Sequence, residues 1–213
     1  TLQAVERPLP GLAPPFLIDG TAVYITDEGR GIAPALAAQL RAAGANAVVC
    51  TDVPPDARSV IFLAGLMAGD RAHAMDVNGA AFAAAAAAAA TYEAQGGLFV
   101  TVQDTGGDFG LGTNPGERAW LAGLSGLAKT AAQEWPLAAV RSIDLACAGD
   151  GSSLAVETAA ERLANELLNG AADLEIGLPA DGRRLAFVSV DTPAAGGSPR
   201  VAAHSVLGVS GGG

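Results

Sequence analysis

The sequence of 213 residues has few of the residues that metal sites, disulfide frameworks and nucleic-acid surfaces require. Its 2 cysteines, Cys50 and Cys147, end apolar runs without a Cys/His cluster, which predicts two small buried side chains and no structural zinc. The 2 histidines, His73 and His204, are isolated in the sequence. Lys and Arg number 12 against 22 Asp and Glu, so a net charge of -10 argues against nucleic acid and anionic membranes as partners.

Long hydrophobic runs are also missing. The longest apolar stretch, Ala80–Ala90, is too short and too rich in alanine to span a bilayer. Residues 1–20 lack the basic start and leucine-rich centre of a signal peptide. Hydrophobic residues nevertheless make up 50% of the chain and charged residues only 16%, which is the opposite of a disordered composition. We therefore expect a soluble, cytoplasmic globular domain.

Short apolar runs alternate with helical stretches along the chain. This alternation predicts an α/β fold: a single domain with a doubly wound, mostly parallel sheet covered by helices on both faces. The predicted strands are Thr21–Thr26, Ala47–Cys50, Ser59–Leu63, Leu98–Gln103, Val140–Leu145, Asp173–Leu178 and Arg184–Val190, and the predicted helices are Gly31–Ala43, Asp76–Ala94, Glu117–Glu134 and Ser153–Asn169.

Composition also suggests how the chain is divided. We expect an extended N-terminal segment over 1–20, the α/β subdomain over 21–190 and a linker over 191–205, where the sequence TPAAGGSPR is typical of linkers. The remaining residues, 206–213, combine a strand-like run with three glycines. Because nucleotide-binding folds begin in this way, we expect here the truncated first strand and glycine turn of a following subdomain.

The turn after the first predicted strand is where such a fold would hold a dinucleotide. Related folds use the pattern TGxxxGxG there, because glycines let the backbone approach the pyrophosphate. The turn TDEGRGIA (residues 26–33) has Asp27 at the first glycine position and Ala33 at the third, and Glu28 adds a second negative charge. Asp52 follows about 20 residues later, where an acidic residue could hold a ribose hydroxyl. We predict a purely structural turn; nucleotide binding is the alternative.

Carbonyl reduction on this fold needs a Tyr-xxx-Lys pair on the helix after the fourth strand, where the lysine lowers the pKa of the phenol. The helix has Lys129, but the residue four positions earlier is Ser125, whose hydroxyl cannot replace the phenol as an acid. Of the 2 tyrosines, Tyr24 lies inside the first strand and Tyr92 has no lysine four residues later. We therefore assign no catalytic residue.

The remaining polar positions are weaker candidates. The fourth strand ends in Gln103–Asp104 where a reductase would place a serine, and Asn78 alone is compatible with reductase chemistry. Gly110–Gly112 matches a GxG pattern, but lies in a loop that we predict to be flexible. Glu161 and Glu166 are expected to form the solvated face of the last helix. No residue is assigned to cofactor binding or to a metal.

Three segments resemble a known family: AW at 119–120 with GLAKTAAQEWP at 126–136, RSIDL at 141–145, and the loop DTGGDFG at 104–110. They resemble the structural, non-catalytic subdomain of the ketoreductase region of type I polyketide synthases and polyunsaturated fatty acid synthases. That subdomain has a degenerate Rossmann fold of the short-chain dehydrogenase/reductase type. The resemblance extends from about Phe16 to Val190.

The resemblance implies a division of labour. In such multifunctional enzymes two short-chain-reductase folds stand in tandem, and the first, without cofactor turn or catalytic tyrosine, supports the second. The second binds NADPH and reduces the β-keto group during polyketide or fatty acid biosynthesis. This chain alone would then be no enzyme and hold no cofactor, and its partners would be the catalytic subdomain of the same polypeptide and, indirectly, an acyl carrier protein. Without its partner it would expose apolar surface and could self-associate.

Two alternatives remain open. The first is an atypical NAD(P)-dependent short-chain reductase that uses Lys129 and Asn78 with an unusual acid, and the missing tyrosine argues against it. The second is a pseudo-Rossmann module that binds a small molecule near residues 29–31 and Gly65. The strand and glycines over 206–213 argue against this second alternative, because a free-standing module would not need them.

Overall fold

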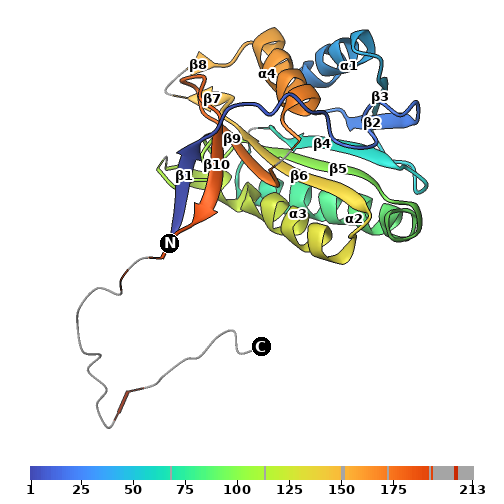
Figure 1. Ribbon diagram of the computed structural model, residues 1–213. Helices are drawn as coiled ribbons and strands as arrows, with labels where there is room; N and C mark the ends of the chain where they lie inside the picture. The colour runs from blue at the N-terminus through green and yellow to red at the C-terminus, as the bar shows by residue number, and fades with distance from the viewer. Residues whose placement is uncertain are drawn as a thin grey trace.

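The computed structural model describes residues 1–67, 69–112, 114–149, 152–171, 173–191, 193 and 204–205, and its centre is an eight-stranded sheet (Figure 1). The strand order is β1-β10-β9-β6-β5-β4-β2-β3. These strands are β1 (Leu2–Glu6), β2 (Ala22–Thr26), β3 (Asn46–Cys50), β4 (Ser59–Gly65), β5 (Gly97–Gln103), β6 (Ala138–Leu145), β9 (Glu175–Leu178) and β10 (Leu185–Ser189). The short strands β7 (Ala148–Gly149) and β8 (Ser152–Ser153) form a separate hairpin.

Six neighbouring strands, from β3 to β9, run parallel, as the alternation of strands and helices predicted. The antiparallel strands β10 and β1 extend this sheet at one edge, with Leu2 opposite Ser189 and Glu6 opposite Leu185. The predicted fold class, a doubly wound and mostly parallel sheet in one domain, is therefore confirmed. Strand β1 was not predicted from the sequence, where residues 1–20 were treated as one extended segment.

Helices cover both faces of the sheet (Figure 1). Helices α1 (Ile32–Ala42) and α4 (Val156–Asn169) lie on one face, and α2 (Arg71–Gln95) and α3 (Gly123–Glu134) lie on the other. Helix α1 buries Ile32, Leu36 and Leu40, the apolar stripe expected from their spacing. The opposite layer packs mainly alanines of α2 against the sheet. Because alanine is small, α2 can approach the strands closely.

Two helical boundaries differ from the prediction. Helix α2 begins at Arg71, five residues before the predicted start at Asp76, because the Asp70 side chain accepts a hydrogen bond from the backbone N–H of His73 at 3.0 Å. The segment Gly116–Ala122 is a 3₁₀ helix, η1, that leads into α3, whereas the sequence predicted one continuous helix. Both differences arise from local hydrogen bonds at the start of a helix. The spacing of hydrophobic residues does not reveal such bonds.

The two cysteines and the C-terminal residues 191–213 were also the subject of predictions. Cys147 is buried as predicted, whereas Cys50 is only half-buried, and both thiols are free. The predicted linker at 191–205 is described only at residues 191, 193, 204 and 205, and the predicted strand and glycine turn at 206–213 lie outside the described residues. Within the described part of the chain, no helix is long and apolar enough to cross a membrane.

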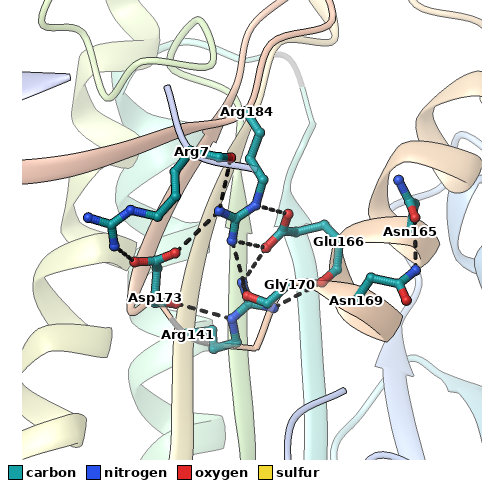
Figure 2. A network of polar contacts seen from close by, with 8 residues as sticks. All are labelled: Arg7, Arg141, Asn165, Glu166, Asn169, Gly170, Asp173 and Arg184. Carbon is teal, nitrogen blue, oxygen red and sulfur yellow. Dashed lines mark hydrogen bonds and ion pairs between the residues drawn. The ribbon is translucent and has the colours of Figure 1, made fainter. Parts of the chain in front are cut away.

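A buried ion network joins α4 to the antiparallel edge of the sheet (Figure 2). Arg184 donates to both carboxylate oxygens of Glu166, at 2.7 Å from Nε and 3.1 Å from Nη2, and Arg141 contacts the same carboxylate. Asp173 links Arg184 to Arg7 of the N-terminal segment. Burial lowers the pKa of the Arg141 guanidinium, and the Glu166 carboxylate opposes this effect.

The prediction of a solvated face was therefore wrong for Glu166, which is only 1% exposed, although it holds for Glu161. Glu166 stands three residues after Leu163 and directly before Leu167, so it belongs to the buried side of α4. Its two arginine partners make this burial possible, because a buried charge needs both charge pairing and hydrogen bonds. Both arginines come from distant parts of the chain.

Candidate functional site

The place where this fold would hold a ligand is the crevice at the carboxyl ends of β2 and β4. Strand β2 lies between β3 and β4: the chain continues from β2 to β3 on one side and then crosses to β4 on the other, so the strand order reverses at β2. Open α/β sheets bind ligands at such switch points. The loop from Asp27 to Gly31 connects β2 to α1 here, and Gly65 ends β4 beside it.

The Glu28 side chain occupies the N-terminus of α1. One carboxylate oxygen accepts hydrogen bonds from the backbone N–H of Ile32 at 2.6 Å and of Arg30 at 3.2 Å. The other accepts from the N–H of Ala33 at 2.9 Å. Glu28 is 1% exposed, so its carboxylate is buried against the first turn of the helix. These are the N–H groups and the positive helix end that would face a pyrophosphate.

The rest of the turn supports this arrangement. The Asp27 carboxylate accepts from the N–H of Gly29 at 2.9 Å, and Gly31 has a positive φ of 95° at the start of the helix. The Arg30 guanidinium donates to the carbonyl of Leu66 at 3.2 Å, and so connects the turn to the segment that follows β4. Sequence reasoning treated Glu28 only as a repulsive charge and missed its role as a helix cap.

Asp52 lies apart from Glu28. It lines a pocket of about 350 Å³ together with Thr26, Thr51 and Phe62, between the carboxyl ends of β2 and β3 and the alanine face of α2. Asp52 follows β3, and the sequence suggested that an acidic residue here could contact a ribose. An acidic side chain therefore lines a pocket after β3, whereas the N-terminus of α1 is occupied by the Glu28 carboxylate.

The candidate catalytic residues on α3 face a carboxylate of β9. Ser125 Oγ donates to Glu175 Oε1 at 2.6 Å, and Lys129 Nζ contacts the same oxygen at 2.8 Å. Tyr92 lies elsewhere, fully buried, with its hydroxyl donating to the carbonyl of Leu98 at 3.2 Å. Burial raises the pKa of the Tyr92 phenol well above its usual value. The structure therefore does not bring a tyrosine and Lys129 together.

Asn78 has a structural contact. Its Nδ2 donates to the backbone carbonyl of Trp120 at 2.8 Å, which fastens η1 to α2. The same region is held by the Arg71 guanidinium, which lies 4.3 Å from the centroid of the Trp120 ring. The Oδ1 atom of Asn78 is buried and has no hydrogen-bond partner among the residues that the structure describes. Asn78 therefore contacts η1, whereas Ser125 and Lys129 contact Glu175.

The glycine-rich loop after β5 folds around Asp144, at the end of β6. The Asp144 carboxylate accepts four hydrogen bonds: from the N–H of Thr105 at 2.6 Å, Thr105 Oγ1 at 2.8 Å, and the N–H groups of Gly107 at 2.9 Å and Phe109 at 2.7 Å. Burial raises the pKa of Asp144 to about 6, although these hydrogen bonds oppose the rise. The start of the loop, up to Phe109, is therefore anchored, whereas the predicted flexibility concerns Gly110–Gly112, which follow it.

Neighbouring polar residues complete this anchor. Gln103 Nε2 donates to Thr105 Oγ1 at 3.0 Å, and Asp104 pairs with the Arg118 guanidinium at 2.5 Å. Gly107 has a positive φ of 81°, and an added Cβ would lie 2.5 Å from the Cα of Pro179. Among the described residues, no group of three His, Cys, Asp or Glu side chains could hold a metal ion.

Comparison with known proteins gives a fold but no family. No protein-family model and no curated protein matches the sequence. Among solved structures, a keto acid-selecting NRPS module with adenylation, ketoreductase and pseudo Asub domains matches 88% of this chain with a TM-score of 0.58 and 15% identity. This chain spans only 18% of that module's length.

Two further structures are similar over nearly their whole length. A small-chain dehydrogenase matches 76% of this chain and 98% of its own length, with a TM-score of 0.52 and 19% identity. A metagenomic short-chain oxidoreductase solved in complex with NADP matches 79% of this chain and 98% of its own length, with a TM-score of 0.50 and 16% identity. At such identities the likeness concerns the fold, which is therefore like that of the short-chain dehydrogenases/reductases.

Proposed function

We propose that this chain is a catalytically silent, short-chain-reductase-like subdomain that supports a neighbouring NADPH-dependent β-ketoacyl reductase subdomain in a polyketide or fatty acid synthase. The observation that carries this proposal is the Glu28 carboxylate at the N-terminus of α1, bonded to three backbone N–H groups. A pyrophosphate in the usual position would have to displace a buried carboxylate and would meet its charge. The turn therefore does not fit a dinucleotide.

The contacts of α3 support the absence of reductase chemistry. The Lys129 ammonium pairs with Glu175, and Ser125 donates to the same carboxylate. A phenol that acts as proton donor must be accessible to the substrate, and Tyr92 is enclosed by the core. Tyr24 lies within β2 and packs against the core, so an atypical reductase would need an acid other than the two tyrosines.

Helix α2 supports the second half of the proposal, the packing against a partner. From Val77 to Tyr92 this helix has no charged residue. Its solvent side exposes Phe82, at 65%, together with Gly79 and several alanines, among them Ala83 and Ala86. A continuous uncharged helix face of this length is unusual on a monomer and typical of a surface that another folded unit covers.

The NRPS module agrees with a multidomain context, since its ketoreductase stands among other domains of one chain. Combined with the sequence resemblance, it supports a place beside a catalytic subdomain of the same polypeptide, which would bind NADPH and receive substrates from an acyl carrier protein. In this arrangement, this chain provides a rigid surface for the catalytic subdomain and no catalytic residue.

The first test is calorimetric titration of NADPH and NADH into this chain. We expect no binding up to about millimolar nucleotide, whereas micromolar affinity would overturn the proposal. The variant Glu28→Gly frees the helix end, so inorganic pyrophosphate should raise its melting temperature but not that of the wild type. Glu93→Gly, at an exposed position of α2, is the control for loss of one acidic side chain. Equal responses of both variants would show that Glu28 does not block the turn.

The second test concerns the uncovered face of α2. We expect the isolated chain to self-associate with increasing concentration in sedimentation velocity, and Phe82→Lys to abolish this association by placing a charge in the apolar face. Leu137→Lys is the matched control, because Leu137 is also a large exposed apolar residue, at 58%, but lies outside α2. A monomeric wild type, or equal effects of both variants, would contradict a docking role for α2.

A further inference from the structure

A pocket of about 250 Å³ lies between α3 and the edge strands β9, β10 and β1. The proposed function makes no use of it, and it is separate from the α1 turn and from the exposed face of α2. Its lining combines a compact polar cluster on one side with aromatic and aliphatic side chains on the other. This combination is typical of small-molecule sites, in which a few polar groups orient a ligand in an apolar cavity.

The polar side consists of Ser125, Lys129 and Glu175. Both Ser125 Oγ and Lys129 Nζ contact the same oxygen, Glu175 Oε1, at 2.6 and 2.8 Å. The other oxygen, Oε2, accepts no hydrogen bond from the described residues, and Lys129 has two further N–H donors. The cluster thus offers one acceptor and at least one donor to a ligand. Its formal charge is zero, because the lysine and the glutamate cancel.

The apolar side consists of Phe109, Phe187, Leu2 and Leu111. The rings of Phe109 and Phe187 meet edge to face, with centroids 4.9 Å apart and an interplanar angle of 85°. The backbone of Phe109 is anchored because its N–H is bonded to Asp144, and its ring packs against Phe187, so this wall is present without a ligand. Leu2 and Leu111 remain about half exposed at 49% and 48%.

We propose that this pocket binds a small neutral aromatic alcohol. A single ring matches the volume, since a cavity of about 150 Å³ already holds benzene, and drug-sized ligands need about 300 Å³ or more. The ring lies against the Phe109 and Phe187 side chains, while the hydroxyl donates to Glu175 Oε2 and accepts from Lys129 Nζ. A neutral ligand is favoured because an anion meets the glutamate and a cation meets the lysine.

The test uses benzyl alcohol as the probe, with benzoate and benzylamine as its charged counterparts, followed by chemical shifts of the backbone amides. We expect benzyl alcohol to bind with a dissociation constant in the millimolar range, as suits a ligand of few atoms. The shifts should be confined to α3, β9, β10 and the loop at Phe109. Benzoate and benzylamine should bind at least about 5-fold more weakly. Shifts elsewhere, or no preference for the alcohol, would overturn the proposal.

Gly126 provides a variant that closes the pocket without touching the polar cluster. It lines the pocket on α3, and an added Cβ there meets no atom within 4 Å. Gly126→Leu should therefore fold, fill the cavity and abolish binding of benzyl alcohol. Gly126→Ala is the matched control, which adds one methyl group and should retain binding. Retained binding in Gly126→Leu, with an unchanged melting profile, would show that the ligand lies elsewhere.

Two further variants test the role assigned to charge. Lys129→Met leaves Glu175 unpaired, so the preference should move from benzyl alcohol toward the cationic benzylamine. Glu175→Gln leaves the lysine unpaired and should move the preference toward benzoate. A purely structural cluster would change stability in both variants but would not invert the order of the charged ligands. The same preference in both variants would contradict the proposed contacts.

Discussion

Replacement of Glu166 by alanine is expected to lower the free energy of unfolding by about 3–5 kcal/mol. The loss arises because the carboxylate is the common partner of Arg141 and Arg184, whose side chains are 3% and 8% exposed. Removing it leaves two guanidinium groups close together in the interior, where neither can be solvated fully. Since small domains are stable by only about 5–15 kcal/mol, this one substitution removes a large part of the margin.

Urea unfolding followed by circular dichroism measures the effect. Glu161→Ala is the matched control, because Glu161 belongs to the same helix but points to solvent, and it should change stability by less than about 0.5 kcal/mol. Glu166→Gln keeps the shape and one acceptor and should fall between the two. If Glu166→Ala were as stable as the control, the ion pairs of the Glu166 carboxylate would do no more than offset the free-energy cost of burying it.

Replacement of Tyr92 by alanine is expected to cost a similar amount, about 3–5 kcal/mol, through a cavity in the layer between α2, α3 and the sheet. The Tyr92 ring contacts two other aromatic rings, with centroids 4.8 Å from Trp135 and 6.1 Å from Phe99. Each of the three residues comes from a different segment of the chain. The ring therefore connects α2, β5 and the end of α3.

Tyr92→Phe separates the ring from its hydroxyl. It removes only the hydrogen bond to the Leu98 carbonyl, so the expected cost is about 1 kcal/mol. Denaturation followed by tryptophan fluorescence in a Trp120→Phe background reports on this cluster, because Trp135, which lies against the ring, is then the remaining tryptophan. Should Tyr92→Phe be as destabilising as Tyr92→Ala, the hydroxyl rather than the packing of the ring would be the important contribution.

Most of the parallel part of the sheet could be predicted because its strands are rich in apolar residues and alternate with helical stretches. Strand β5 is buried at every position, and its observed bounds, Gly97–Gln103, differ from the predicted ones by one residue. Strand β1 could not be found in this way. Its sequence, LQAVE, is exposed at four of five positions, and it is a strand only because its backbone pairs with β10.

Glu28 and Glu166 are both buried, but the sequence gives different amounts of information about their partners. The partners of Glu28 are backbone N–H groups two to five residues away, so a careful reading of the helix start could have identified a cap. The partners of Glu166 are Arg141 and Arg184, which are 25 and 18 residues distant. Charge and periodicity alone cannot reveal such a pairing, because it depends on how the sheet is ordered.

The pairing of β1 with β10 has a mechanical consequence. The backbone nitrogen of Thr1 donates to the Val190 carbonyl at 2.9 Å, and the Val190 N–H donates to the Thr1 carbonyl at 2.8 Å, so residues 1 and 190 lie side by side at one end of this ladder. Tension applied between residues 1 and 190 would open the ladder like a zipper, one hydrogen bond after another. Helix packing and the six parallel strands would carry no load until β1 had peeled away.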